Sequence, residues 1–257
     1  MGNSNASTIS LSVNLNKIAL IRNSRDGDFP SVERFGQLCI DAGVGGLTVH
    51  PRPDLRHIHP KDVYALSKLT KQNPGVELNV EGNPEASPNE NYPGLMAIVE
   101  HVRPTQCTLV PDTDGQKTSD HGFDLKRDSD KVAPYVEKLR ALGVRVSLFM
   151  DPDVEQIALA KDIGADRIEL YTGPYAWAYE RGEKHVKQLF DQHCKAAECA
   201  QSLGLGVNAG HDLNLHNMLL YKTLPGLAEV SIGHGLTVDS LLMGFNKALK
   251  AYLDVCR

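Results

Sequence analysis

Four side chains suited to acid–base chemistry stand at or near the ends of short apolar segments that are far apart in the sequence. They are His50, Glu81, Glu169 and His211. Imidazole and carboxyl groups are common general acids and bases, and each positioned group contributes about 10²–10⁴-fold to a rate. A carboxylate at Asp212 would favour the charged form of His211, which suits a proton donor. We therefore expect an active site if the fold brings these ends together, with ordinary salt-bridge partners as the alternative for the two glutamates.

A dense patch of cationic and imidazole side chains follows His50. Two prolines stiffen the chain there, and Arg52, Arg56 and His57 supply donors for a phosphate or carboxylate, which arginine can bind in a fork. The alternative is a solvated charged loop. His57 and His59 could also form a metal pair, because some barrel hydrolases carry such a pair at a strand end. This pair lies well past the predicted strand, which disfavours the metal hypothesis.

The residues that could do chemistry follow a regular pattern of predicted strands. Eight apolar segments recur at roughly thirty-residue intervals: 11–14, 46–50, 76–81, 106–111, 144–151, 167–172, 205–211 and 229–234. Between them lie segments with helical spacing of apolar residues: 32–42, 60–71, 92–102, 128–142, 154–163, 184–203, 215–223 and 239–255. Glycines that follow several of these helices suit left-handed C-caps.

Strict alternation of strand and helix predicts an α/β protein, a single (β/α)8 TIM barrel with extended βα loops. An open doubly wound sheet is the alternative, but residues 14–17 lack the glycine-rich turn that such a fold places after its first strand. We expect one catalytic domain over residues 11–257 and a disordered leader over 1–10. A barrel gathers all strand C-termini at one face, so the candidate residues would meet in one pocket. Gly233, His234 and Gly235 follow the last strand, where barrels often bind phosphate through backbone N–H groups.

Three connections are longer than a turn requires: 83–91, 112–127 and 173–183. Long loops in compact domains are often functional lids. The second is polar and follows the fourth strand on the predicted catalytic face. We expect it to move over bound substrate and exclude water, with a flexible surface loop as the alternative.

Composition excludes several classes of protein. The 257 residues carry a net charge of −5 without a long basic run, which argues against nucleic acid or an acidic membrane surface as partner. No apolar run approaches the ~20 residues of a membrane span. The five cysteines form no CxxC pair and are expected to be free thiols of a cytoplasmic protein.

Seven segments together resemble the pyridoxine 5'-phosphate synthase family. They are 13–25, 48–58, 109–111, 146–149, 171–173, 207–211 and 231–234. The resemblance runs in order from about residue 11 to the C-terminus. It implies a barrel enzyme that condenses 1-deoxy-D-xylulose 5-phosphate with 3-amino-1-hydroxyacetone 1-phosphate and releases inorganic phosphate and water. It implies two phosphorylated small-molecule substrates, no metal or redox cofactor, and a homo-octamer built from dimers.

The resemblance also implies roles for individual positions. His50 and Glu81 match the family's proton acceptors, His211 its proton donor and Glu169 a transition-state stabiliser. The positions that match the amino-ketone phosphate site are Asn14, Arg25, His211, Asp212, Gly233 and His234. Those that match the sugar-phosphate site are Arg52, His57 and Thr118.

The chain departs from the family pattern at three places. Asn16 and Lys17 stand where Asp-His is commoner, Asp212 replaces a usual glycine, and residues 82–91 form an enlarged segment after Glu81. We still expect Asn16 and Lys17 to contact substrate, because Lys17 keeps a positive charge for an anionic ligand. Two alternatives stay open: a metal-assisted barrel hydrolase or aldolase that uses His57, His59 and His211, or a phospho-ligand-binding homologue without catalysis.

Overall fold

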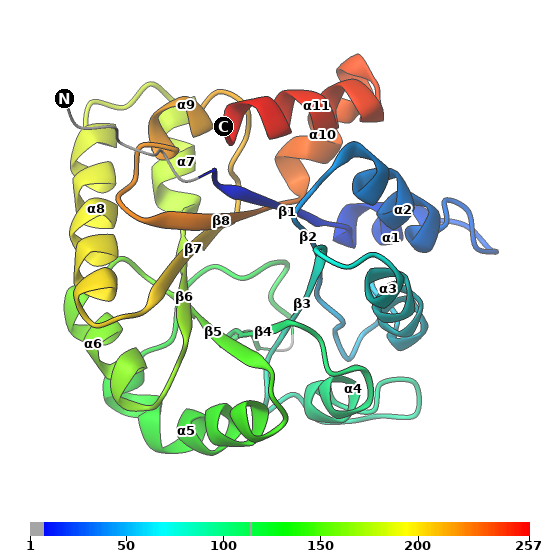
Figure 1. The fold of residues 1–257 in the computed structure, drawn as a ribbon, viewed down its shortest axis with the longest axis horizontal. Coiled ribbons are helices and arrows are strands. Elements are labelled where there is room, and N and C mark those ends of the chain that lie inside the picture. The colour runs from blue at the N-terminus through cyan, green and yellow to red at the C-terminus, as the bar shows by residue number, and fades with distance from the viewer. Residues whose placement is uncertain (1–7, 114) are drawn as a thin grey trace.

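The protein forms a barrel of parallel strands surrounded by helices (Figure 1). A computed structural model describes residues 8–113 and 115–257. The expected disordered leader lies mostly outside the described residues, and its described part already contains the start of the first strand at Ser10.

Eight strands close the barrel in sequence order, and every neighbouring pair is parallel. They are β1 (Ser10–Asn14), β2 (Gly46–Val49), β3 (Glu77–Gly82), β4 (Gln106–Leu109), β5 (Arg145–Met150), β6 (Arg167–Tyr171), β7 (Gly206–Gly210) and β8 (Leu227–Ile232). Pairing of β1 with β8 leaves the closed sheet without a free edge. The predicted (β/α)8 barrel is therefore confirmed.

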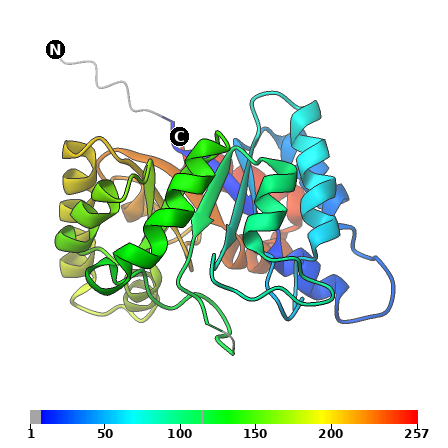
Figure 2. The ribbon, with the colours of Figure 1, turned by 90° about the horizontal axis from the view of Figure 1, so that it is seen from below.

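Helices run alongside the strands on the outside of the barrel (Figure 2). They are α1 (Asn16–Arg22), α2 (Val32–Ala42), α3 (Pro60–Gln72), α4 (Leu95–Val102), α5 (Leu125–Ala141), α6 (Val154–Asp162), α7 (Gly173–Glu180), α8 (Val186–Ser202), α9 (Met218–Tyr221), α10 (His234–Met243) and α11 (Phe245–Val255). Among the described residues, none of the helices combines the length and apolar composition needed to cross a membrane.

Two predictions about helices were wrong. The expected long loop at 173–183 is mostly α7, because Pro174 suits the first turn of a helix rather than interrupting one. The expected helix at 239–255 is two helices, since Gly244 separates α10 from α11 with a φ of 88°. The short α1 was not predicted.

The inside of the barrel is polar. Along the strands, apolar residues such as Leu78 and Val80 are buried in the hydrophobic core and alternate with Asn79 and Glu81. Side-chain hydrogen bonds join the polar set across neighbouring and opposite strands. Its members include Ser12, Thr48, Asn79, Gln106, Thr108, Glu169 and Asn208. Most barrels of this kind are filled by branched apolar side chains. In this barrel, polar side chains of different strands instead contact one another in the interior.

Candidate active site

A cavity of about 300 Å³ opens at the C-terminal ends of the strands. Its lining includes every residue predicted to act on or bind substrate except Arg25, Arg56 and Gly235. The four predicted acid–base residues are among them: His50, Glu81, Glu169 and His211. Arg25 is exposed on the segment after α1 and donates to the carbonyl oxygen of Ser24. The structure therefore gathers all but these few predicted residues in one pocket.

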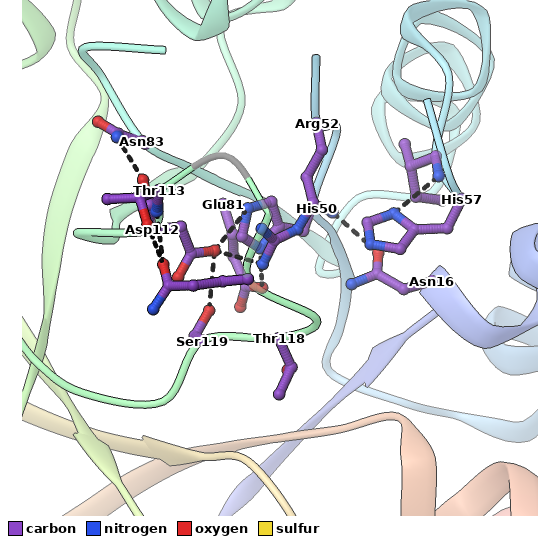
Figure 3. A network of polar contacts seen from close by, with 12 residues as sticks. Asn16, His50, Arg52, His57, Glu81, Asn83, Asp112, Thr113, Thr118 and Ser119 are labelled. Carbon is purple, nitrogen blue, oxygen red and sulfur yellow. Dashed lines mark hydrogen bonds and ion pairs between the residues drawn. The ribbon is translucent and has the colours of Figure 1, made fainter. Parts of the chain in front are cut away.

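His50 lies between two carboxyl groups directly after β2 (Figure 3). Its Nδ1 atom is 3.7 Å from Glu81 Oε2, and its Nε2 atom is 3.5 Å from Asp112 Oδ2. The backbone N–H of His50 donates to Asn16 Oδ1 at 2.9 Å, which fixes the end of the strand. Burial, with the nearby Arg52 charge, holds the pKa of His50 well below its usual range. The imidazole is thus neutral near pH 7 and able to accept a proton.

Asp112 lies behind the pocket lining and contacts two of its residues, His50 and Arg52, a role that the sequence did not reveal. It is buried and forms an ion pair with Arg52, and Ser119 Oγ donates to Asp112 Oδ2 at 3.1 Å (Figure 3). Burial raises the pKa of Asp112, while the Arg52 guanidinium opposes that shift. Its position just beyond the end of β4 was the available signal, because the other chemically suited residues also follow strand ends.

Glu81 at the end of β3 and Glu169 in β6 are both buried. Burial raises the pKa of Glu81 well above its usual range, and the charges of Glu169 and Asp112 raise it further. Burial, with the neighbouring Glu229, raises the pKa of Glu169 to about 8. Two carboxyl groups with raised pKa values in one pocket can hold and exchange protons near neutral pH.

His211 follows β7 and is held from two sides. The Thr118 hydroxyl is 2.8 Å from His211 Nε2, and Asp212 Oδ2 is 3.2 Å from His211 Nδ1. Trp177 Nε1 donates to Asp212 Oδ2 at 2.7 Å. The Thr118 contact orients the imidazole, while Asp212 lies at ion-pair distance from Nδ1 without forming a hydrogen bond to it.

The backbone conformation directly after β7 differs from the prediction. The residues with positive φ are His211 at 84° and Asp212 at 58°, whereas Gly210 was expected to permit the turn. Gly210 has another role: a Cβ atom there would lie 2.1 Å from Glu169 Oε1. The missing side chain makes room for the Glu169 carboxyl group.

Replacing Asp212 with glycine is expected to lower turnover about 10- to 100-fold, because His211 loses the carboxylate at ion-pair distance that favours its charged form. The melting temperature should not fall, since glycine adopts positive φ without steric cost. Initial rates and thermal melts of Asp212→Gly, with Asp212→Asn as the variant that keeps the acceptor, test this. An unchanged rate in Asp212→Gly would show that the contact does not matter.

Contacts outside the pocket position the cationic loop after β2. Arg22 pairs with Asp62 at 2.5 Å, and both side chains are buried. Asn23 Nδ2 donates to the carbonyl oxygens of Leu55 and His57 at 3.1 and 2.8 Å. These contacts fix the backbone that carries His57, whose pKa is lowered to about 3 by burial and by Arg52.

The segment between β4 and α5 lies over the pocket. Lys117, Thr118 and Ser119 contribute to the lining, and Arg56 Nη1 donates to the carbonyl oxygens of Gln116 and Lys117 at 2.6 and 3.1 Å. The segment projects at the lower edge of the barrel in Figure 2. It reaches from the side of β4 to His211, so its position is compatible with the predicted lid, whose movement stays a prediction.

Gly233 and His234, two of the residues predicted to hold phosphate, lie on the β1 and β8 side of the pocket. Gly233 precedes α10, and a Cβ atom there would lie 2.9 Å from the Cβ atom of Asn14. Asn14 and Lys17 also line the cavity, as does His234 at the first position of α10. Backbone N–H groups at a helix start and a lysine are suitable partners for an anion.

The structure does not bring together at the pocket the two histidines of the disfavoured metal alternative. His57 is part of its lining, and its Nδ1 accepts from the backbone N–H of Ile58 at 2.9 Å. His59 instead precedes α3, where its backbone N–H donates to Asp62. Within residues 8–113 and 115–257, no group of three or more His, Cys, Asp or Glu side chains is arranged to hold a metal ion.

Comparison with known proteins extends over nearly the whole chain. A family model described as "Pyridoxal phosphate biosynthesis protein PdxJ" matches residues 11–257. A pyridoxine 5'-phosphate synthase from Xanthomonas campestris pv. campestris (strain B100) is 52% identical over 247 residues, which cover 95% of each chain. One from Xylella fastidiosa (strain 9a5c) is 49% identical over 246 residues, which cover 95% of this chain and 94% of the relative.

Solved structures of more distant proteins share the fold alone. The 3-hexulose-6-phosphate synthase from Salmonella typhimurium superposes with a TM-score of 0.63 at 15% identity, over 96% of this chain and 98% of that one. A 4-hydroxy-2-oxoglutarate aldolase gives a TM-score of 0.60 at 14% identity, over 98% of this chain and 96% of the other. Both comparisons are consistent with the barrel.

Proposed function

The chain belongs to the PdxJ family of pyridoxine 5'-phosphate synthases, and we propose that it joins 1-deoxy-D-xylulose 5-phosphate to 3-amino-1-hydroxyacetone 1-phosphate. Formation of the pyridine ring of pyridoxine 5'-phosphate would release inorganic phosphate and water. The observation that carries the proposal is the convergence of His50, Glu81, Glu169 and His211 on one cavity. Joining an amine to a carbonyl and then expelling water and phosphate requires repeated proton transfers, which these groups can serve.

Each acid–base residue has a proposed role. His50 and Glu81 accept protons, and the neutral imidazole of His50 supports this role. His211 donates a proton, supported by its position between Thr118 and Asp212. Glu169 stabilises the transition state, and its raised pKa supports a protonated carboxyl group that donates a hydrogen bond to developing negative charge.

The two phosphorylated substrates have proposed positions in the cavity. The amino-ketone phosphate contacts Asn14, His211, Asp212, Gly233 and His234, and the sugar phosphate contacts Asn16, Lys17, Arg52, His57 and Thr118. Backbone N–H groups before α10 support the first site, and the Arg52 and Lys17 charges support the second. Arg25 stays assigned to the amino-ketone phosphate by resemblance to the family.

A direct assay tests the proposed function. The purified protein is expected to convert both phosphates to pyridoxine 5'-phosphate and to release one inorganic phosphate for each ring formed. An active relative assayed in parallel provides the control. Binding of both substrates without product would support a phospho-ligand-binding homologue instead, and activity lost together with stoichiometric zinc would support a metal-assisted enzyme.

We also propose that the protein is a cytoplasmic homo-octamer built from dimers. Its five cysteines are free, which fits a reducing compartment. The octamer is supported by an exposed apolar surface on α10, where Leu241 is 78% and Leu242 is 82% exposed. Leu20 and Ile21 of the contacting α1 are also exposed. Apolar surface of this kind commonly marks an interface.

The double variant Leu241→Glu/Leu242→Glu is expected to reduce the assembly to a smaller species, because burying the new charges at an interface would be unfavourable. Light scattering coupled to size-exclusion chromatography measures the mass. Val154→Glu, which places a charge on an exposed apolar residue of α6, is the control. A wild-type protein that elutes as a monomer would contradict the octamer.

A further inference from the structure

A chain of hydrogen-bonding groups links Glu81 to Glu169 through the inside of the barrel. Asn79 Nδ2 lies 3.5 Å from Glu81 Oε1, and the hydroxyl of Thr108 donates to Asn79 Oδ1 at 3.0 Å. Thr108 Oγ1 is also 3.4 Å from Glu169 Oε2. Asn79 is 2% exposed and Thr108 is fully buried, so water does not replace these contacts. The chain therefore connects two carboxyl groups of the pocket through two side chains that do not line it.

The chain has a direction because its middle members donate and accept at defined atoms. The hydroxyl of Thr108 is within donor distance of two acceptors, Asn79 Oδ1 at 3.0 Å and Glu169 Oε2 at 3.4 Å, and its one hydrogen makes the shorter bond to Asn79. With this hydrogen directed at Asn79, Thr108 Oγ1 presents a lone pair to Glu169, and a protonated Glu169 can donate to it. At the other end, Asn79 Nδ2 presents an N–H group to Glu81, and this contact favours an ionised Glu81.

A second side-chain amide also presents an N–H group to Glu81. Asn14 Nδ2 lies 3.5 Å from Glu81 Oε2, so both oxygen atoms of this carboxyl group face an N–H donor. Glu169, in contrast, has Thr108 as its side-chain hydrogen-bond partner among the described residues. The two ends of the chain thus differ: donors surround Glu81, and Glu169 faces an oxygen that is free to accept.

We propose that Asn79 and Thr108 are positioning residues that keep a proton on Glu169 and leave Glu81 ionised as the proton acceptor. The inference deepens the proposed function, on which the role of Glu81 rests. The reverse state, with the proton on Glu81, requires the amide of Asn79 to rotate by 180°, so that Oδ1 faces Glu81 and Thr108 donates to Glu169.

Charged groups surround both glutamates and act on them together with the proposed hydrogen-bond chain. His50, Asp112 and Arg52 face Glu81 from β2 and from the segments after β2 and β4. Glu229 of β8 faces Glu169, and Arg167 Nη1 pairs with Glu229 at 3.5 Å. Burial raises the pKa of both glutamates, and the charges of Glu169, Asp112 and Glu229 raise the pKa of Glu81 further, so the hydrogen-bond chain acts against these charges when it leaves Glu81 ionised.

Infrared difference spectroscopy of the unliganded protein tests the proposal. At pH 7, the carboxylic acid C=O band of the buried pair is expected to disappear in Glu169→Gln and to persist in Glu81→Gln. Thr108→Val keeps the side-chain shape but removes the acceptor of the Glu169 proton. It should lower the pH at which the Glu169 band titrates by about one unit, the size expected for one hydrogen bond. Each Thr108 variant is compared with and without Glu169→Gln, which isolates that band.

Two matched variants separate this effect from a general loss of packing. Thr108→Ser retains the hydroxyl and is expected to restore the wild-type midpoint. Thr70→Val removes a buried hydroxyl of α3, far from the chain, and should leave the midpoint unchanged.

Two results would overturn the proposal. One is a band that disappears in Glu81→Gln and persists in Glu169→Gln. The other is a midpoint that rises in Thr108→Val, as expected if Thr108 donated to an ionised Glu169. The spectra need no turnover, so an inactive wild-type protein would reject the proposed function and still allow this test.

Discussion

Replacing Glu81 with glutamine is expected to lower kcat by about 10²–10⁴-fold, the contribution of one positioned general base. Glutamine has nearly the same size and can keep one of the two contacts with Asn14 and Asn79, but it cannot accept a proton. The melting temperature should not fall, because burial disfavours the charged form of Glu81 and raises its pKa. Steady-state rates with both phosphates, together with thermal melts, measure the two effects.

Glu85→Gln is the matched control, since Glu85 is exposed on the loop after β3. It should leave both rate and stability unchanged. If Glu81→Gln lost activity and stability to the same extent, Glu81 would be a structural residue rather than a proton acceptor.

Replacing Glu169 with glutamine is expected to stabilise the folded protein, and more strongly as the pH rises. The carboxyl group of Glu169 has an ordinary pKa of 4.5 and a pKa of about 8 in the folded protein. Between these values the folded state binds a proton that the unfolded state has lost, so this group makes stability fall as pH rises. Below pH 4.5 both states are protonated and the penalty is absent. Glu169→Gln should therefore gain roughly 3–5 kcal/mol at pH 8 and little at pH 4.5.

Denaturant unfolding of wild type and variant between pH 4.5 and 9 measures this gain. Glu137→Gln on the exposed surface of α5 is the control and should follow the wild-type curve. A gain that does not depend on pH would show that Glu169 is not held in its protonated form. The same variant is expected to turn over more slowly, because an amide is a weaker hydrogen-bond donor than a carboxylic acid.

The barrel could be predicted because its signals are local. Each strand is a short apolar segment such as 106–109, each helix has its own periodicity, and glycines such as Gly43 and Gly143 have the positive φ expected after a helix. The strand-end position of His50, Glu81 and His211 then followed from the geometry of parallel barrels.

What the sequence did not reveal depends on contacts between distant segments. The importance of Asp112 arises from its burial beside Arg52 and His50, which are about sixty residues away in the chain. Gly210 was expected to make a turn, but its actual role is to leave space for Glu169 of the neighbouring strand. The glycine and proline at the start of α7 are equally common in loops, so local composition favoured the wrong element.

The polar interior of the barrel has a consequence for how this chain can change over generations. Asn79 and Thr108 are hydrogen-bond partners inside the barrel, so replacing one leaves the other without its partner, whereas replacing both with apolar residues removes the unsatisfied group. A double-mutant cycle at Asn79 and Thr108 would therefore show strong epistasis. In descendants of this sequence, the residues at these two positions should be replaced together, so that the polar lining of the barrel is kept or lost as a whole.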